Sequence, residues 1–228
     1  MFIGLLFLPD SVRTLHKNIV RSPKSYNSQV GVPLSVWQMQ AEHELAIFEA
    51  GISLPGEMSK LEKIIQPTVG LFTNIGQAHA ENFSNHQLKL KEKLLLFASV
   101  DKLVWCKDYS EITSAIKNAG IAEERLFSWS RKSNANLVIS KVVKPTRHQE
   151  GDVTENVTRI QGIYKQDFQE IVIPFSDEAS IENAIHCWAM LLMLGYEQDT
   201  IAQRMLLLTP VAMRLELKEG INNCSVIN

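Results

Sequence analysis

Short apolar runs alternate with stretches of helical periodicity over the first 130 residues of the chain. The runs predict β-strands, because each is apolar and only a few residues long. They lie at 18–20, 45–50, 69–73, 103–106 and 126–129. Apolar residues at helical spacing predict helices at 33–44, 58–65, 87–98 and 110–118. This alternation predicts an α/β fold with a mainly parallel sheet flanked by helices.

The pattern changes after residue 130. Apolar runs at 137–143, 157–164 and 169–173 are separated by polar connections, which predicts an antiparallel β extension of the sheet. A long helix at 178–194 and a second one at 200–208 follow, and residues 223–228 predict a last strand. The long helix carries one apolar face, formed by Ile181, Ala184, Ile185, Trp188 and Leu192.

The composition is that of an ordinary globular protein: 45% of the 228 residues are hydrophobic, 21% are charged, and the net charge is -2. This balance gives no electrostatic reason to expect a nucleic acid or a membrane as a partner. The cysteines Cys106, Cys187 and Cys224 form no C-x-x-C pair, which favours a reducing, cytoplasmic location. Residues 1–9 are apolar but lack a basic flank and are too short to span a bilayer, so we expect a buried strand or a helix end.

Polar residues follow two of the predicted parallel strands, where ligands gather in open sheets. Glu49 lies at the end of the strand at 45–50. One interpretation is an acid that binds a metal ion or lies beside a bound phosphate, and the other is a solvated acid in a loop. Asn74, His79 and Glu81 follow the strand at 69–73 and are able to reach the same cleft. His79 is a candidate metal ligand or base, although a single loop histidine is also often simply exposed.

Three lysines, Lys89, Lys91 and Lys93, lie on the helix at 87–98 and suggest a solvated basic face. One of them, turned to the cleft, would bind phosphate or react with CO2 to give a carbamate, an oxygen ligand for Mg²⁺. Arg214 is either a phosphate-binding residue or a surface strand arginine, and Asn183 beside the apolar face of its helix needs a polar partner. The chain has no Gly-Lys pair and no G-x-G-x-x-G, G-x-S-x-G or H-E-x-x-H motif.

Several segments, in this order, resemble the central domain of the Mur ligases. They are RSPKSYNSQVGVPL from Arg21, EAGISLPGEM from Glu49, TNIGQAH from Thr73, KEKLLLF from Lys91, SIENA from Ser180 and MRLE from Met213. The resemblance covers residues 17 to 228. The motifs are most similar to those of family members that add D-alanyl-D-alanine, including a form that is fused to an alanine racemase.

The resemblance implies an ATP- and Mg²⁺-dependent ligase of peptidoglycan synthesis. In such an enzyme the carboxylate of a UDP-N-acetylmuramoyl tripeptide is phosphorylated, and the amine of D-alanyl-D-alanine attacks the acyl phosphate. Carried over by motif, Glu49 and His79 would hold Mg²⁺, and Lys93 would be a carbamylated lysine beside it. The other implied roles are nucleotide binding by Asn74, Asn183 and Arg214, with Asn183 facing the adenine, and substrate binding by Asn27 and Ser28.

The chain also departs from the family, in which a strand and a G-x-x-G-K-[ST] loop precede the segment beginning near Asn18. We therefore expect an atypical N-terminal segment at 1–17, a partial central domain with an incomplete P-loop fold at 18–210, and the start of a junction to a missing C-terminal domain at 211–228. Because the loop supplies a phosphate-binding lysine, we expect negligible ligase activity from this chain alone. Two alternatives stay open: a non-catalytic remnant or interaction module, and a metallohydrolase built on Glu49, His79 and Glu81.

Overall fold

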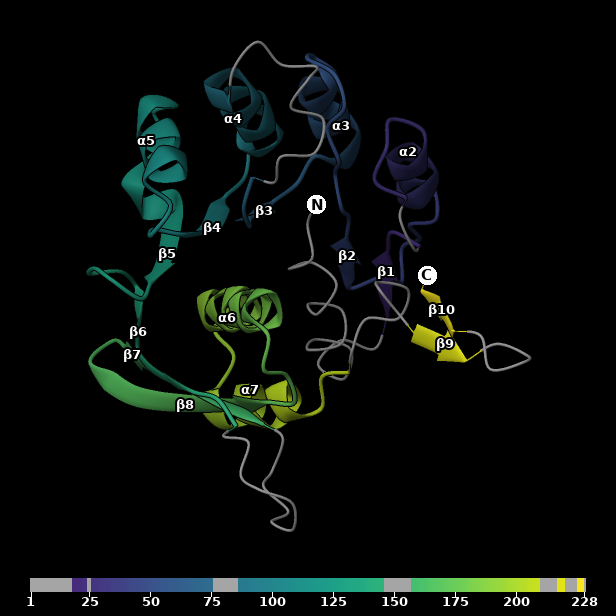
Figure 1. The fold of residues 1–228 in the computed structure, drawn as a ribbon. Coiled ribbons are helices and arrows are strands. Elements are labelled where there is room, and N and C mark those ends of the chain that lie inside the picture. Colours follow the sequence, from purple (N-terminus) through teal and green to yellow (C-terminus); the bar gives the residue numbers. More distant parts are fainter. Residues whose placement is uncertain are drawn as a thin grey trace.

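The computed structural model describes residues 18–23, 26–75, 86–145, 157–209, 217–219 and 225–227. The first half is a succession of strands and helices (Figure 1). Its strands are β1 (Ile19–Arg21), β2 (Leu45–Ile47), β3 (Val69–Phe72), β4 (Lys102–Cys106) and β5 (Leu126–Ser130). Its helices are α2 (Gly31–Val36), α3 (Glu57–Ile65), α4 (His86–Leu94) and α5 (Ser110–Asn118), with 3-10 turns η2 (Leu95–Phe97) and η3 (Glu123–Arg125).

The second half begins with three longer strands and ends with two helices and a small hairpin. The strands are β6 (Leu137–Val143), β7 (Thr158–Tyr164) and β8 (Asp167–Ile173). The helices are α6 (Glu178–Met193) and α7 (Gln198–Leu206), and the hairpin pairs β9 (Leu217–Glu219) with β10 (Ser225–Ile227). Among the described residues, no helix combines the length and the apolar character needed to cross a lipid bilayer.

The main sheet has six strands in the order β3-β4-β5-β6-β7-β8. The pairs from β3 to β6 are parallel, and β6–β7 and β7–β8 are antiparallel. This confirms the predicted α/β class, the mainly parallel sheet and its antiparallel extension. Among the residues that the structure describes, β1 and β2 pair with each other in a two-stranded sheet and not with the six-stranded one.

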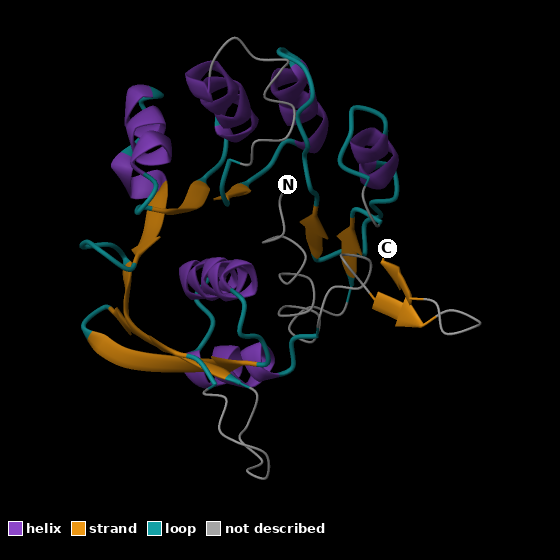
Figure 2. Cartoon of the chain, in the orientation of Figure 1, coloured by secondary structure: helices purple, strands orange, loops and turns teal. Residues whose placement is uncertain are grey.

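Strand β4 shows why the sequences of the central strands are unbroken apolar runs. Helices α4 and α5 lie over one face of the sheet and α6 lies under the other (Figure 2). All residues of β4 after Lys102 are therefore buried, since a parallel strand with both faces covered has no solvated side. Trp105 packs into the cluster with α4 and α5, whereas Val104 packs into the cluster with α6.

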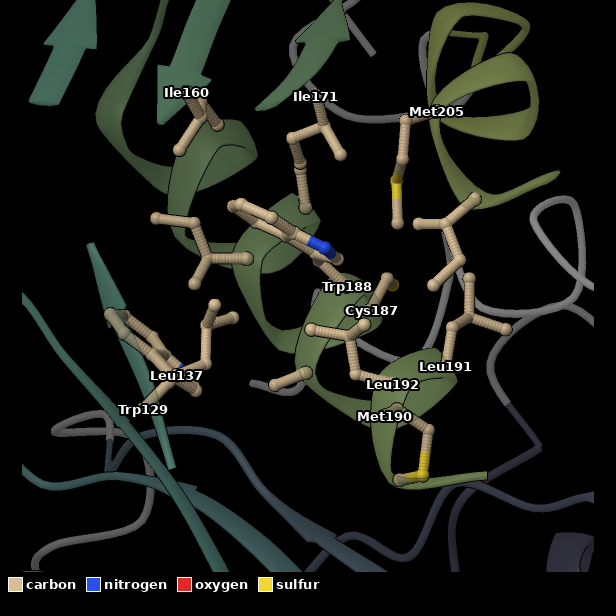
Figure 3. Packing of buried hydrophobic residues seen from close by; sticks show 14 of the residues in the cluster. Trp129, Leu137, Ile160, Ile171, Cys187, Trp188, Met190, Leu191, Leu192 and Met205 are labelled. Carbon is tan, nitrogen blue, oxygen red and sulfur yellow. The ribbon is translucent and has the colours of Figure 1, made fainter. Parts of the chain in front are cut away.

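Helix α6 is the centre of the larger core cluster. It begins where the Asp177 carboxylate accepts a hydrogen bond from the Ser180 amide at 2.9 Å, and the chain turns after it at Gly195, whose φ is +84°. The predicted apolar face is confirmed, but burial extends around the helix to Asn183, His186 and Cys187. Figure 3 shows Trp188, Leu191 and Leu192 of α6 among side chains of the strands and α7.

The predicted helix at 33–44 is wrong over most of its length. Helix α2 ends at Val36, and residues 37–42 are exposed. The amide of Gln40 instead donates to His43 Nδ1 at 2.8 Å in a turn. An isolated short helix is marginal in water, and the side chains of this stretch, Trp37 and Met39 included, are exposed and so provide no burial to extend the helix.

Gly70 in β3 provides a test of this packing. A Cβ at this position would lie 2.5 Å from Phe97 Cδ1 and 3.0 Å from Leu103 Cδ1. We expect Gly70→Ala to lower the free energy of unfolding by about 1–3 kcal/mol in urea denaturation, because the core has no room for the methyl group. Combining it with Phe97→Leu should cost less than the sum of the two single changes. Simple additivity would argue that Phe97 does not exclude the Cβ.

Candidate functional site

Glu49 and Asn27 meet at the carboxyl end of β2. The Asn27 side chain donates from Nδ2 to Glu49 Oε1 at 2.9 Å, and the Gly51 amide donates to the Asn27 carbonyl at 2.7 Å. The Glu49 amide in turn donates to Ser22 Oγ at 3.2 Å. Glu49 is only 7% exposed, so it is not the solvated loop acid that was one of its two interpretations. A hydrogen bond therefore connects Glu49, a predicted metal ligand, with Asn27, a predicted substrate-binding residue.

Ser28, the second predicted substrate residue, takes part in the start of α2. Its Oγ accepts a hydrogen bond from the Gly31 amide at 3.1 Å, and its carbonyl accepts from the Val32 amide at 3.0 Å. These bonds satisfy backbone donors that the first turn of a helix leaves without intrahelical partners. Ser28 itself is exposed, so its side chain is accessible to a ligand beside the Asn27–Glu49 pair.

The predicted solvated basic face of α4 is wrong for two of its three lysines. Lys89 is 3% exposed and Lys93 is 4% exposed, whereas Lys91 is exposed. Burial, followed by the charge of Lys89, lowers the pKa of Lys93 from 10.5 to about 7. A large share of the Lys93 amine is thus neutral near neutral pH, which is the form that reacts with CO2.

Glu92, between these lysines in sequence, fixes α4 against α3. Its Oε1 accepts hydrogen bonds from the Gly56 amide at 2.7 Å and the Met58 amide at 3.3 Å. Glu57 completes the turn, because its Oε2 accepts from the amides of Ser53 and Leu54. A carboxylate at the N-terminus of α3 is favourable for the helix dipole, so the loop after Glu49 is held at two points.

Asn183 is buried in α6 and its side-chain Nδ2 has no hydrogen-bond partner among the described residues. A buried amide donor left without an acceptor is costly, so the position is suited to a ligand acceptor. Asn74, the other predicted nucleotide residue in the described part, directly follows β3 and is half-buried. Its neighbour Thr73 is 1% exposed, and Thr73 Oγ1 also has no partner among the described residues.

His186, one helical turn after Asn183, was not singled out from the sequence. Its Nδ1 accepts a hydrogen bond from Trp129 Nε1 at 3.0 Å, and complete burial lowers its pKa to about 3. The neutral ring therefore carries its proton on Nε2, which lies 3.9 Å from Glu182 Oε1. Glu182 also accepts from the Tyr109 hydroxyl at 2.7 and 2.9 Å. A histidine inside an apolar helix gave no signal in the sequence, because its partner Trp129 lies 57 positions away.

Two predicted site residues, His79 and Arg214, lie outside the described residues, as does Glu81. Within the described part of the chain, no group of three His, Cys, Asp or Glu side chains is arranged to hold a metal ion. Glu49 is therefore the one predicted metal ligand whose surroundings are described.

Comparison with known proteins identifies the family. The model of the Mur ligase middle domain matches residues 8–191. The chain is 27% identical over 163 residues to the UDP-N-acetylmuramoyl-tripeptide–D-alanyl-D-alanine ligase of Rickettsia prowazekii, covering 69% of this chain and 34% of that protein. It is 25% identical over 211 residues to the Bacillus subtilis enzyme of the same name, covering 90% of this chain and 42% of that one.

Solved structures share the fold. The crystal structure of MurF from Acinetobacter baumannii superposes with a TM-score of 0.77 at 20% identity, over 96% of this chain and 46% of that chain. MurF from Thermotoga maritima in complex with ADP superposes with a TM-score of 0.75 at 17% identity, over 96% of this chain and 48% of that chain. The chain thus spans less than half the length of these proteins.

The buried amine of Lys93 makes a prediction about stability and pH. Between pH about 7 and 10.5 the Lys93 amine is neutral in the folded chain but still protonated in the unfolded chain. The unfolded state therefore binds more protons in this range, and the free energy of unfolding rises with pH. Lys93→Met should therefore be more stable than the parent chain near pH 7. This advantage should shrink by about 2–4 kcal/mol as the pH approaches 10, measured by denaturant unfolding.

Lys91→Met is the matched control, because Lys91 lies on the same helix but is exposed. Its stability difference from the parent chain should stay nearly constant over the same pH range. A constant difference for Lys93→Met as well would show that the Lys93 amine is charged in the folded protein.

Proposed function

This chain belongs to the Mur ligase family, whose middle domain it contains, and we propose that it forms the nucleotide-binding part of a MurF-type ligase. The proposed enzyme uses ATP and Mg²⁺ in the cytoplasm to join D-alanyl-D-alanine to a UDP-N-acetylmuramoyl tripeptide. A phosphoryl group passes from ATP to the tripeptide carboxylate, and the dipeptide amine then displaces phosphate from the acyl phosphate. The names of the relatives support these substrates.

The observation that carries the nucleotide role is the buried Nδ2 of Asn183, which lacks an acceptor among the described residues. A ring nitrogen of adenine is such an acceptor, and binding it would remove the cost of a buried unsatisfied donor. Asn74 and Arg214 are proposed to bind the same nucleotide. The fold likeness to a MurF in complex with ADP supports a nucleotide in this domain.

Glu49 fits the role of a magnesium ligand. It supplies a hard carboxylate oxygen, and the hydrogen bond from Asn27 occupies only Oε1 and fixes the orientation of the group. Mg²⁺ would neutralise charge on the phosphates during transfer. We propose His79 as the second ligand and Asn27 and Ser28 as neighbours of the muramoyl peptide.

Lys93 is proposed to be carbamylated. The nitrogen of its neutral amine attacks CO2 and loses a proton, which leaves a carbamate anion in place of the neutral amine. Its lowered pKa supports this chemistry, since a protonated amine has no lone pair for the attack. The carbamate oxygens would provide a further ligand for Mg²⁺.

A second candidate function is a non-catalytic module that keeps the fold and binds another protein segment. The observation that favours it is an exposed apolar surface at α2, where Trp37 is 84% exposed and Val30 is 70% exposed. Apolar groups exposed together mark interaction sites more often than isolated ones do. Nucleotide binding separates the two candidates, because only the first requires it.

Calorimetric titration with Mg·ATP tests the proposal. We expect weak binding by the 228-residue chain, with a Kd of about 1 mM, and about tenfold weaker binding by Asn183→Leu. Asn118→Leu, at an exposed amide on α5, should bind like the parent chain. In a separate assay, the 228-residue chain alone should release no ADP from ATP when both peptide substrates are present, because its sequence lacks the G-K-[ST] motif. An absence of nucleotide binding would favour the interaction module.

Carbon-13 NMR in labelled bicarbonate tests the role of Lys93. We expect one slowly exchanging carbamate signal in the parent chain and in Lys91→Met. The signal should be absent from Lys93→Met and should disappear on acidification below pH about 6, where the amine is protonated. A parent chain without the signal would exclude carbamylation of the isolated domain.

A further inference from the structure

Helices α4 and α5 lie side by side over the sheet (Figure 1). A cavity of about 650 Å³ lies between them. This volume is within the range of about 300–1,000 Å³ that is typical of small-molecule sites. None of the described residues proposed to bind Mg²⁺, nucleotide or peptide lines this cavity. The cavity is therefore a candidate site for a second ligand.

The buried part of the cavity is aliphatic. Leu90 and Leu94 of α4 are buried, and Ala115 of α5 and Ile121 after it are partly buried. Phe, Tyr and Trp are absent from the described residues that line the cavity, so no such ring is available to stack on a nucleobase. The uncharged polar side chains of the lining are exposed at Gln87, Ser110, Ser114 and Asn118. These surroundings favour a ligand with an aliphatic body.

The charged residues of the lining favour an anion. Glu111 is the one carboxylate among the described lining residues, and its Oε2 already lies 2.7 Å from His86 Nδ1. Lys91 and Arg125 are the two cations. With His86 neutral, two positive charges and one negative charge leave the lining with a formal charge of +1. An anionic ligand is therefore favoured over a cationic one.

Arg125 is suited to hold the anionic group. Its Nε donates to the Val100 carbonyl at 2.6 Å, and its Nη2 donates to the Ala98 carbonyl at 3.1 Å. These bonds fix the guanidinium, whereas Nη1 has no hydrogen-bond partner among the described residues. No Asp or Glu in the described part of the chain forms an ion pair with Arg125. A carboxylate would provide both the missing acceptor and the missing counter-ion.

We propose that the cavity between α4 and α5 binds an aliphatic carboxylate, with its carboxylate at Arg125 and its hydrocarbon chain along Leu90 and Leu94. A single negative charge matches the lining, whereas a phosphate monoester carries a charge of about -1.5 to -2. Burial of the chain against the leucines supplies most of the affinity, and the charged hydrogen bond sets the direction in which the ligand lies.

This site is separate from the proposed ligase site. His86, Leu90 and Leu94 recur every four residues and line the cavity on one side of α4. Glu92 lies on the opposite side of the helix, where it accepts the amides of Gly56 and Met58 at the start of α3. A ligand in the cavity therefore leaves this contact intact, and the proposal does not depend on nucleotide binding.

Methyl NMR of the 228-residue chain, titrated with dodecanoate below its micelle concentration, tests the proposal. We expect saturable binding with a Kd of about 10–100 μM. The methyl signals of Leu90 and Leu94 should shift, and those of Leu137 and Leu191 in the other core cluster should not. Dodecanol has the same chain without the charge, so it should bind at least tenfold more weakly.

Two variants of α5 provide the matched pair. Ser114→Phe fills the cavity from an exposed lining position and should weaken dodecanoate binding at least tenfold. Lys117→Phe places the same ring at an exposed position outside the lining and should bind like the parent chain. Unchanged Leu137 and Leu191 signals would show that the core of each variant is intact. Should Ser114→Phe not fold, the comparison of dodecanoate with dodecanol on the parent chain still decides the proposal.

Four results would overturn the proposal. They are no binding up to about 1 mM dodecanoate, equal affinity for dodecanol, unchanged affinity in a folded Ser114→Phe, and shifts at other leucines in place of Leu90 and Leu94. Shifts of Leu45 and Leu71, for example, would place the ligand in the smaller apolar cavity beside β2 and β3.

Discussion

The burial of helix α6 on nearly all sides is the constraint on which the rest of the structure depends. An α-helix that is apolar around most of its circumference must be enclosed on those sides, because an apolar face is not stable against water. Strands β4 and β5 pack above α6, the sheet then bends through β6, and β7 and β8 pass below it with α7 (Figure 1). The change from parallel to antiparallel pairing at β6 allows one continuous sheet to follow the helix in this way.

This enclosure also decides the properties of the polar residues on α6. Burial removes water as a partner, so Asn183 and His186 depend on groups that come from far along the chain or from a ligand. His186 receives the indole proton of Trp129 and stays neutral. Asn183 has no such partner among the described residues, which is the observation behind its proposed contact with a nucleotide base.

On the other side of the sheet, buried charged groups define the proposed metal side of the site. Lys89, Lys93 and Glu92 lie in one short helix and are all nearly inaccessible to solvent. Glu92 is stabilised by backbone amides at the start of α3, and this contact connects α4 to the loop that follows Glu49. The lowered pKa of Lys93 is thus a consequence of how α4 is packed, and the same packing supports the proposed carbamate.

The sequence alone determined the α/β class, the order of strands and helices, the antiparallel extension and the family resemblance. These features depend on local periodicity and on motifs of neighbouring residues, such as the apolar run of β4. The tertiary structure decided the early end of α2, the burial of Lys89 and Lys93, the Asn27–Glu49 hydrogen bond and the Trp129–His186 pair. It also decided that, among the described residues, β1 and β2 pair apart from the six-stranded sheet. Each of these depends on contacts between segments far apart in the chain, which periodicity does not encode.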